Sequence, residues 1–313
     1  LMEVSKVINN DQFPPTTDKL NFVDHISKFI GLAVSQLYLL CALVTCYEVI
    51  SRYVFNSPTQ WAFETVMVLC ASAWMLSAGY ITLHKRHIGI TVIYILVSKA
   101  KQWYLDLFAY IIGIISLWFF VDDTLVRAIE SVMMTERAGT AWNSPQPLIL
   151  KTMLVTGAII YLTQLLVNLY RHFDSKLVKN IISAVAAFIV FRIILVFLEH
   201  AFEIKGIIAI NEHLSSLAAY IEPTKYIDIR DIGIKWASII IVSLMILLMM
   251  TGMPLGVVTL FVSILSALFY FGFNGLYLVS TNAFGLLEAY PLIAVPLFVL
   301  MASILEKAGV AED

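Results

Sequence analysis

The feature that most constrains this chain is a series of apolar blocks, each close to or above the length needed to cross a lipid bilayer as a helix. A hydrocarbon core about 30 Å thick requires roughly 20 apolar residues in helical form. The blocks are residues 29–50, 62–83, 104–121, 148–169, 181–198, 237–271 and 291–305. In hydrocarbon every backbone polar group must be bonded internally, and these blocks are too long for barrel strands. We therefore predict an all-α, polytopic membrane protein with about seven transmembrane helices.

Composition supports this fold class. Apolar residues make up 60% of the chain and charged residues 13%, whereas a soluble domain carries about half and a quarter. Buried helices of a soluble protein would also need polar faces, which these blocks lack. The net charge of −2 implies no basic surface for nucleic acid. The three cysteines lie inside apolar blocks, where a thiol behaves as a small hydrophobe.

The distribution of Lys and Arg predicts the orientation of the first spans. Basic residues are more frequent in the N-terminal tail (1–28), in the second loop (84–103) and after the fourth span than in the loops between. We expect a multi-pass protein of the bacterial inner membrane with a cytoplasmic N-terminus. The first four spans would form an up-down four-helix bundle with both ends in the cytoplasm.

The fifth apolar block and the segment after it form a predicted connector. Arg192 interrupts the block, and its guanidinium is expected to reach the outer interface, or else to pair with Glu199 or with another helix. Residues 200–235 carry mixed charge, with apolar positions at helical spacing. They predict an interfacial or linking helix ended by Pro223, or otherwise an ordinary loop.

Three residues are candidates for shaping the outer rim of the bundle. Glu48 and Arg52 are four residues apart, a spacing that allows an ion pair on one helix face. Glu64 opens the second span, where a carboxylate suits the helix dipole. Arg52, Trp61 and Glu64 would bracket a short outer turn at residues 56–58. A purely structural role explains the same pattern equally well.

A second candidate feature is the sequence Gly252-Met253-Pro254-Leu255-Gly256 inside a long apolar block. Proline removes a backbone donor and glycine loosens a helix, so Gly252, Pro254 and Gly256 predict a kink or an unwound turn. Broken helices in secondary transporters expose backbone groups to ions or substrate. Kinks of this kind also occur in membrane helices without such a role.

No constellation for catalysis is present, and we predict that the chain is not an enzyme. It lacks the zinc-protease motif HExxH and the nucleophile motif GxSxG. A transmembrane haem needs axial histidines well inside facing helices. The histidines of this chain instead lie outside the predicted spans or at their edges, at positions 25, 84, 87, 172, 200 and 213. We predict no cofactor in this chain.

Two stretches together resemble the membrane components of tripartite ATP-independent periplasmic (TRAP) transporters. Residues 51–58 (SRYVFNSP) and 60–64 (QWAFE) resemble the motif of the small, DctQ-like subunit. His87-Ile88 fits this subunit too, but Thr91 stands where the family usually has an aspartate. Residues 252–256, 290–298 and 307–312 resemble the beginning of the large, DctM-like subunit. Both stretches in this order are similar to a fusion of the two subunits.

This resemblance implies a domain organisation. Residues 1–28 would be a cytoplasmic tail, and residues 29–175 a small-subunit-like four-helix domain. Residues 176–235 would be a connector with one transmembrane helix. Residues 236–313 would begin the large-subunit-like transport domain, with the rest of that subunit as a partner.

The resemblance also implies a sodium-driven importer of a small organic anion, fed by a periplasmic solute-binding protein. Na⁺ coupling is expected for the complete transporter, and the substrate-binding residues are expected beyond Asp313. This chain would serve mainly as a scaffold in the lipid bilayer. Two alternatives stay open: a membrane anchor for a redox or signalling complex, and a self-sufficient channel or carrier.

Overall fold

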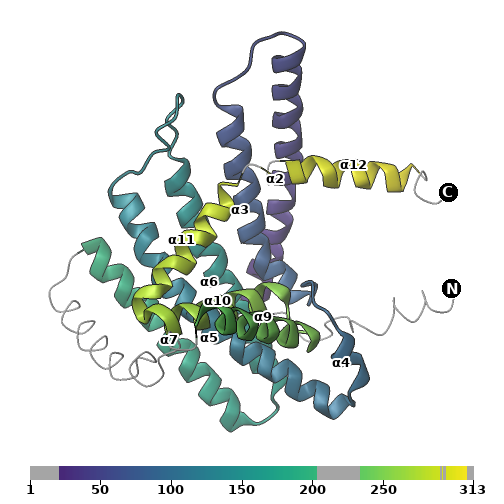
Figure 1. The fold of residues 1–313 in the computed structure, drawn as a ribbon, viewed down its shortest axis with the longest axis vertical. Coiled ribbons are helices and arrows are strands. Elements are labelled where there is room, and N and C mark those ends of the chain that lie inside the picture. Colours follow the sequence, from purple (N-terminus) through teal and green to yellow (C-terminus); the bar gives the residue numbers. More distant parts are fainter. Residues whose placement is uncertain (1–20, 203–232, 290, 292–293, 309–313) are drawn as a thin grey trace.

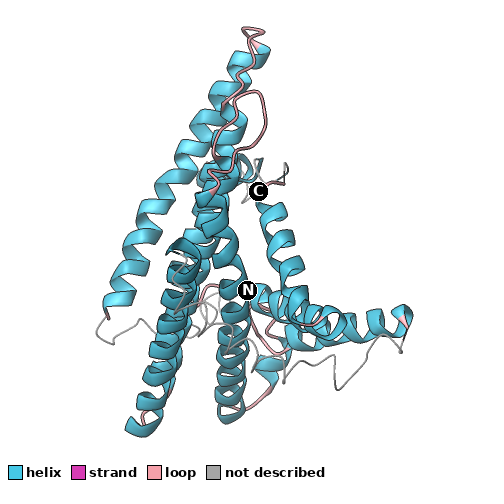
Figure 2. Cartoon of the chain, turned by 90° about the vertical axis from the view of Figure 1, so that its left-hand side faces the viewer, coloured by secondary structure: helices cyan, strands magenta, loops and turns pink. Residues whose placement is uncertain are grey.

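The computed structural model describes residues 21–202, 233–289, 291 and 294–308, and these residues form helices and connecting loops (Figures 1 and 2). The prediction of an all-α polytopic membrane fold is confirmed. Within the described ranges five helices are long and apolar enough to cross a bilayer. They are α2 (Phe22–Tyr53), α3 (Ala62–Leu83), α5 (Lys99–Met133), α6 (Gln146–His172) and α7 (Lys176–Phe202). The start of the predicted tail and the predicted linking helix before Pro223 lie outside the described residues.

The last two predicted spans are shorter helices than the apolar blocks suggest. Block 237–271 is divided into α9 (Ile234–Met250) and α10 (Leu255–Phe271), each of 17 residues or about 25 Å. A short 3₁₀ turn, Phe273–Gly275, then leads into α11 (Leu276–Leu287). The final block contains α12 (Val295–Lys307), with 13 residues. The chain breaks between α9 and α10 because Gly252 adopts a φ of +87° and Pro254 has no N–H to donate.

The five long helices are arranged as a row in the order α2, α3, α6, α5, α7, in which each helix packs mainly on its neighbours. In the most apolar stretches of α3 and α6, 50% of the residues are buried, against 17% in α2 and 22% in α7. The main apolar core therefore lies between α3, α5 and α6. The edge helices α2 and α7 leave large apolar side chains such as Leu43 and Phe188 exposed, as expected for surfaces that face lipid.

Close contact between α3 and α6 depends on glycine. A Cβ on Gly157 would lie 2.4 Å from the carbonyl oxygen of Met75, and one on Gly79 would lie 2.4 Å from Ile160. Small residues at such crossings let helix backbones approach in membranes, where packing rather than the hydrophobic effect holds helices together. The centre of the row is therefore rigidly packed.

The later helices attach to one side of this row. In Figure 1, α9 and α10 lie across the long helices, and α12 projects sideways from the α2–α3 pair. α10 packs on α5, α11 packs on α5 and α6, and α12 contacts α2. A second apolar core joins α5 to these helices through Ile112, Leu248, Met253, Val257, Val258 and Val262.

Candidate functional site

The tip of the α2–α3 pair, at the turn between the two helices, is closed by the carboxylate of Glu48. Its Oε1 accepts a hydrogen bond from Arg52 Nε at 3.0 Å, and its Oε2 accepts one from the backbone N–H of Thr59 at 3.1 Å. The Thr59 hydroxyl donates to the same Oε2. Glu48 therefore ties the end of α2 to the turn that leads into α3, while the Arg52 side chain stays 48% exposed.

The structure separates the three predicted rim residues into two groups. The Trp61 ring stacks on Tyr47 with the centroids 5.9 Å apart and is 38% exposed, so it lies at the accessible tip with Arg52. Glu64 is only 5% exposed and accepts hydrogen bonds from the hydroxyls of Thr140 and Ser144. It therefore anchors the outer loop between α5 and α6 from inside and presents no free carboxylate.

The break between α9 and α10 is held by the loop between α3 and α5. This loop contains α4 (Val92–Leu96). The backbone N–H of Leu255 donates to the carbonyl of Ile88 at 2.8 Å, and Gly89 forms an isolated antiparallel bridge with Pro254. A Cβ on Gly89 would lie 3.1 Å from the carbonyl oxygens of Gly252 and Met253, so the glycine permits this contact.

This contact, which we call the inner joint after the predicted orientation of the first spans, links two stretches that are distant in the sequence. Gly252 and Pro254 lie in the break, whereas Gly256 lies in the first turn of α10. A Cβ on Gly252 would lie 3.1 Å from Tyr94, so both the positive φ and the space favour glycine there. The backbone groups freed by the break are thus partly satisfied by the preceding loop.

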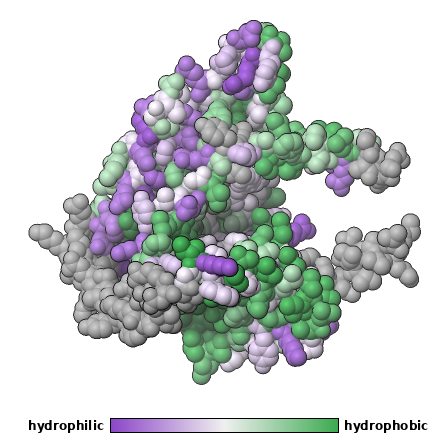
Figure 3. All heavy atoms as spheres, in the orientation of Figure 1, coloured by the Kyte–Doolittle hydropathy of each residue, from purple (hydrophilic) through white to green (hydrophobic). Residues whose placement is uncertain are grey.

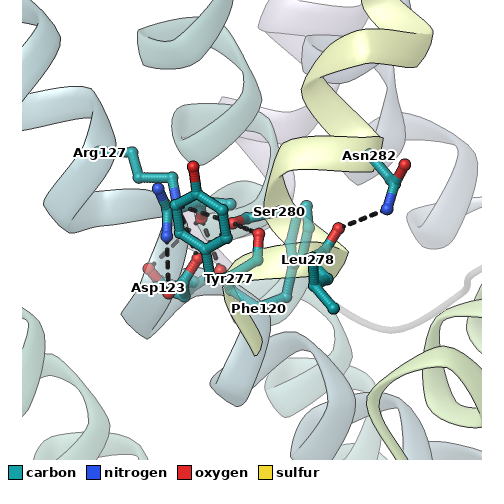
Figure 4. A network of polar contacts seen from close by, with 9 residues as sticks. Phe120, Asp123, Arg127, Tyr277, Leu278, Ser280 and Asn282 are labelled. Carbon is teal, nitrogen blue, oxygen red and sulfur yellow. Dashed lines mark hydrogen bonds and ion pairs between the residues drawn. The ribbon is translucent and has the colours of Figure 1, made fainter. Parts of the chain in front are cut away.

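A second contact, which we call the outer joint after the same predicted orientation, connects α5 with α11 through polar side chains (Figure 4). Arg127 Nε lies 2.9 Å from Asp123 Oδ2 and 2.8 Å from Ser280 Oγ. The Ser280 hydroxyl donates to Asp123, and the Arg127 guanidinium lies 3.8 Å from the centroid of the Tyr277 ring. Polar groups that bond across helices are favourable in a membrane because water cannot replace them.

A cavity of about 350 Å³ lies beside the outer joint, between α5, α6 and α11. Its two cations are already paired, since Arg127 contacts Asp123 and Lys151 Nζ lies 2.5 Å from Glu136 Oε2. Burial alone would raise the pKa of Glu136, but hydrogen bonds from Lys151 and Ser131 hold that pKa below its usual value. Both signs of charge are therefore balanced in the cavity.

A buried polar network lies at the opposite ends of the helices from the Glu48 turn, and it was not predicted from the sequence. Asp24 on α2 is fully buried, and both of its carboxylate oxygens accept hydrogen bonds from the Arg171 guanidinium on α6. Gln164 Nε2 donates to Asp24 Oδ1 at 2.9 Å, and Gln164 Oε1 accepts from Ser27 at 2.8 Å. The ion pair spans 147 positions in sequence, so no local spacing could have revealed it.

His87, in the loop after α3, lies at the same ends of the helices as Asp24. Its Nε2 lies 2.8 Å from the Thr82 hydroxyl, and its ring stacks on Tyr161 with the centroids 5.0 Å apart. Burial lowers the pKa of His87 to about 4, so the imidazole is neutral at physiological pH. Arg192 Nη2, on α7, lies 3.8 Å from Asp122 Oδ1 on the neighbouring helix α5, which agrees with the predicted pairing with another helix.

A comparison with protein families assigns the central part of this arrangement. Residues 41–175 match the family described as "Tripartite ATP-independent periplasmic transporters, DctQ component". Residues 41–175 form a DctQ domain. No curated protein matches the chain. The match begins within α2 and covers α3 to α6. It includes Glu48 at the tip and Arg127, which forms the α5 part of the outer joint.

The DctQ family is a family of transporter components. The described residues hold no group of three or more His, Cys, Asp or Glu side chains that could bind a metal ion. Both joints connect the DctQ domain to the helices that follow it, the inner joint through residues 88–94 and the outer joint through α5. The domain is therefore in direct contact with α9, α10 and α11.

Proposed function

We propose that this chain is a membrane component of a TRAP transporter that imports a small organic anion, and that its DctQ domain is the scaffold. In this proposal α9 to α12 begin the transport subunit, and the chain is a fusion of DctQ-like and DctM-like parts. The match to the DctQ component and the two joints support the proposal.

The observation that carries the scaffold role is the attachment of the helices after the DctQ domain at two separate points. The inner joint holds the break before α10 by backbone contacts, and the outer joint holds α11 by charged side chains. Close glycine contacts within the DctQ domain, and the pair that its Arg171 forms with Asp24 at the start of α2, resist relative movement of the helices. A rigid row attached in this way would let a neighbouring domain move substrate while the assembly keeps its position.

The interior of the DctQ domain favours support over substrate binding. In the cavity beside the outer joint, Arg127 and Lys151 each face a carboxylate of the protein, so an added anion would have to displace it. We accordingly assign no substrate-binding residue among the described ones. Na⁺ coupling, delivery by a periplasmic solute-binding protein, and an inner-membrane location with a cytoplasmic N-terminus are part of the proposal.

The decisive experiment measures flux of labelled organic anions into proteoliposomes under a Na⁺ gradient. Vesicles would contain the chain alone, or the chain with a complete transport subunit, each with and without the solute-binding protein. We expect uptake only when the transport subunit, the binding protein and Na⁺ are all present. Binding-protein-independent flux through the chain alone would support a self-sufficient carrier and contradict the scaffold role.

The exposed tip offers a test of partner contact. We expect Trp61→Ala to reduce uptake in the complete system while membrane insertion stays unchanged, because the indole is accessible at the outer rim. Glu64→Gln should also reduce uptake, through loosening of the outer loop. The matched control is Tyr104→Ala, because Tyr104 is an exposed aromatic residue near the start of α5, at the opposite helix ends from Trp61. Unchanged uptake in both rim variants would exclude a rim role.

A further inference from the structure

The loop between α3 and α5 and the first turn of α5 carry a cluster of basic side chains that form no ion pair within 4 Å with the described residues. Residues 84–103 contain no Asp or Glu. Their four Lys and Arg side chains are exposed: Lys85, Arg86, Lys99 and Lys101. Among the ion pairs formed by the described residues, none involves these four. The nearby Asp106 accepts a hydrogen bond from Tyr94 and attracts Lys85 electrostatically without forming an ion pair with it.

The same loop exposes large apolar side chains between the basic ones. Ile88 is 80% exposed and Leu96 81%, with Val92 and Ile95 also exposed. Figure 3 shows hydrophobic residues gathered at the lower right of this face, in the region of α4 and α9 in Figure 1, with hydrophilic residues along the lower edge. Apolar side chains flanked by cations are typical of segments that lie in a membrane interface.

The loop backbone is held in place while these side chains point away from the protein. Ile88 is bonded to Leu255 in the inner joint, and Gln102 Nε2 donates to the carbonyl of Tyr94 at 2.9 Å. α4 also contacts α9. The cations and the apolar residues are therefore presented by a fixed backbone, so a ligand would not have to order the loop first.

We propose that residues 84–103 form a binding surface for anionic phospholipids. The phosphate groups would neutralise Lys85, Arg86, Lys99 and Lys101, while Ile88, Val92, Ile95 and Leu96 would enter the edge of the acyl region. Lysine and arginine beside a membrane are attracted to anionic headgroups. A soluble polyanion would leave the four apolar side chains in water, so the mixed character favours a lipid leaflet. This binding is independent of the transport function.

Lipid selectivity tests the proposal directly. The full chain would be reconstituted in mixed phosphatidylglycerol and phosphatidylcholine, and the association of each spin-labelled lipid measured by electron paramagnetic resonance. The wild-type chain should prefer phosphatidylglycerol, and high salt should weaken the preference. Each removed cation is expected to reduce it by about fivefold at most, and a variant with all four changed to Gln should lose it.

Two matched variants separate this surface from general charge effects. Changing the scattered exposed lysines Lys28, Lys176, Lys235 and Lys307 to Gln removes the same charge and should keep most of the preference. Replacing Lys85, Lys99 and Lys101 by Arg should keep it fully. Equal loss in the scattered and the clustered Gln variants would overturn the proposal, as would a wild-type chain without preference.

Insertion of the apolar side chains has its own readout. An environment-sensitive fluorophore on Leu96→Cys, in a Cys46→Ser background, reports on this position because Cys41 and Cys70 are buried. We expect a blue-shifted emission that lipid-depth quenchers reduce, and loss of that quenching in the clustered Gln variant. Emission typical of an aqueous environment, in folded protein that keeps the four basic side chains, would contradict the proposal.

Discussion

Replacement of Arg171 by Leu is expected to destabilise the protein strongly, because it leaves the buried carboxylate of Asp24 without its charge partner. Asp24 is fully buried, and the Arg171 side chain is 21% exposed. Removing one partner of a buried ion pair costs about 3–5 kcal/mol. The lower end of that range is expected, since Asp24 keeps its hydrogen bonds from Gln164 and from the backbone N–H of Asn21.

The matched control is Arg52→Leu. Arg52 also pairs with a carboxylate, Glu48, but on the same helix and with its side chain 48% exposed. Exposed pairs of this kind contribute about 0–1 kcal/mol. The two variants therefore remove the same side chain and the same type of interaction, and they differ in burial and in whether the pair joins two helices.

The assay is equilibrium unfolding of the purified chain in mixed micelles, followed by circular dichroism as the fraction of sodium dodecyl sulfate increases. Arg171→Leu should shift the midpoint far more than Arg52→Leu. Adding Asp24→Asn to Arg171→Leu should recover part of the loss, because the unpaired buried charge is then gone. Equal shifts for both arginine variants, or no recovery in the double variant, would refute the reasoning.

Three further predictions concern packing, pH and the outer loop. Gly157→Ala should destabilise by about 1–3 kcal/mol in the same unfolding assay, since its Cβ meets backbone, whereas Gly285→Ala meets nothing within 4 Å and should be neutral. His87, whose pKa is about 4 against 6.5 when unfolded, stays neutral only in the folded protein. Stability should therefore be complete above pH 6.5 and fall by up to about 3 kcal/mol as the pH drops toward 4, and His87→Phe should flatten this dependence. Glu64→Leu should speed limited proteolysis within residues 134–145, and an unchanged cleavage rate would show that the carboxylate does not anchor that loop.

The candidate site was only partly accessible from the sequence. Arg52, Trp61 and Glu64 were singled out by local spacing, and local spacing correctly places Arg52 beside Glu48. It could not show that Glu64 faces inward, because its partners Thr140 and Ser144 lie 76 and 80 positions away. Asp24 was not noticed for the same reason.

The sequence alone determined the five long helices, whereas the short helices α4 and α11 lie outside the predicted apolar blocks. Blocks of apolar residues must satisfy their backbone groups locally in hydrocarbon, and that requirement depends on composition and length rather than on neighbours. It also marked the break at Gly252 and Pro254, because tolerance of a positive φ is a property of glycine and a missing N–H is a property of proline.

Only the tertiary structure decided which helices pack together and which residues form the contacts between them. The row order α2, α3, α6, α5, α7, the contact of Gly89 with Pro254 and the Arg127–Ser280 bond all join residues distant in sequence. Apolar helices present similar surfaces to lipid and to one another, so their pairing depends on a few glycines and polar groups whose partners become visible only when the chain is folded.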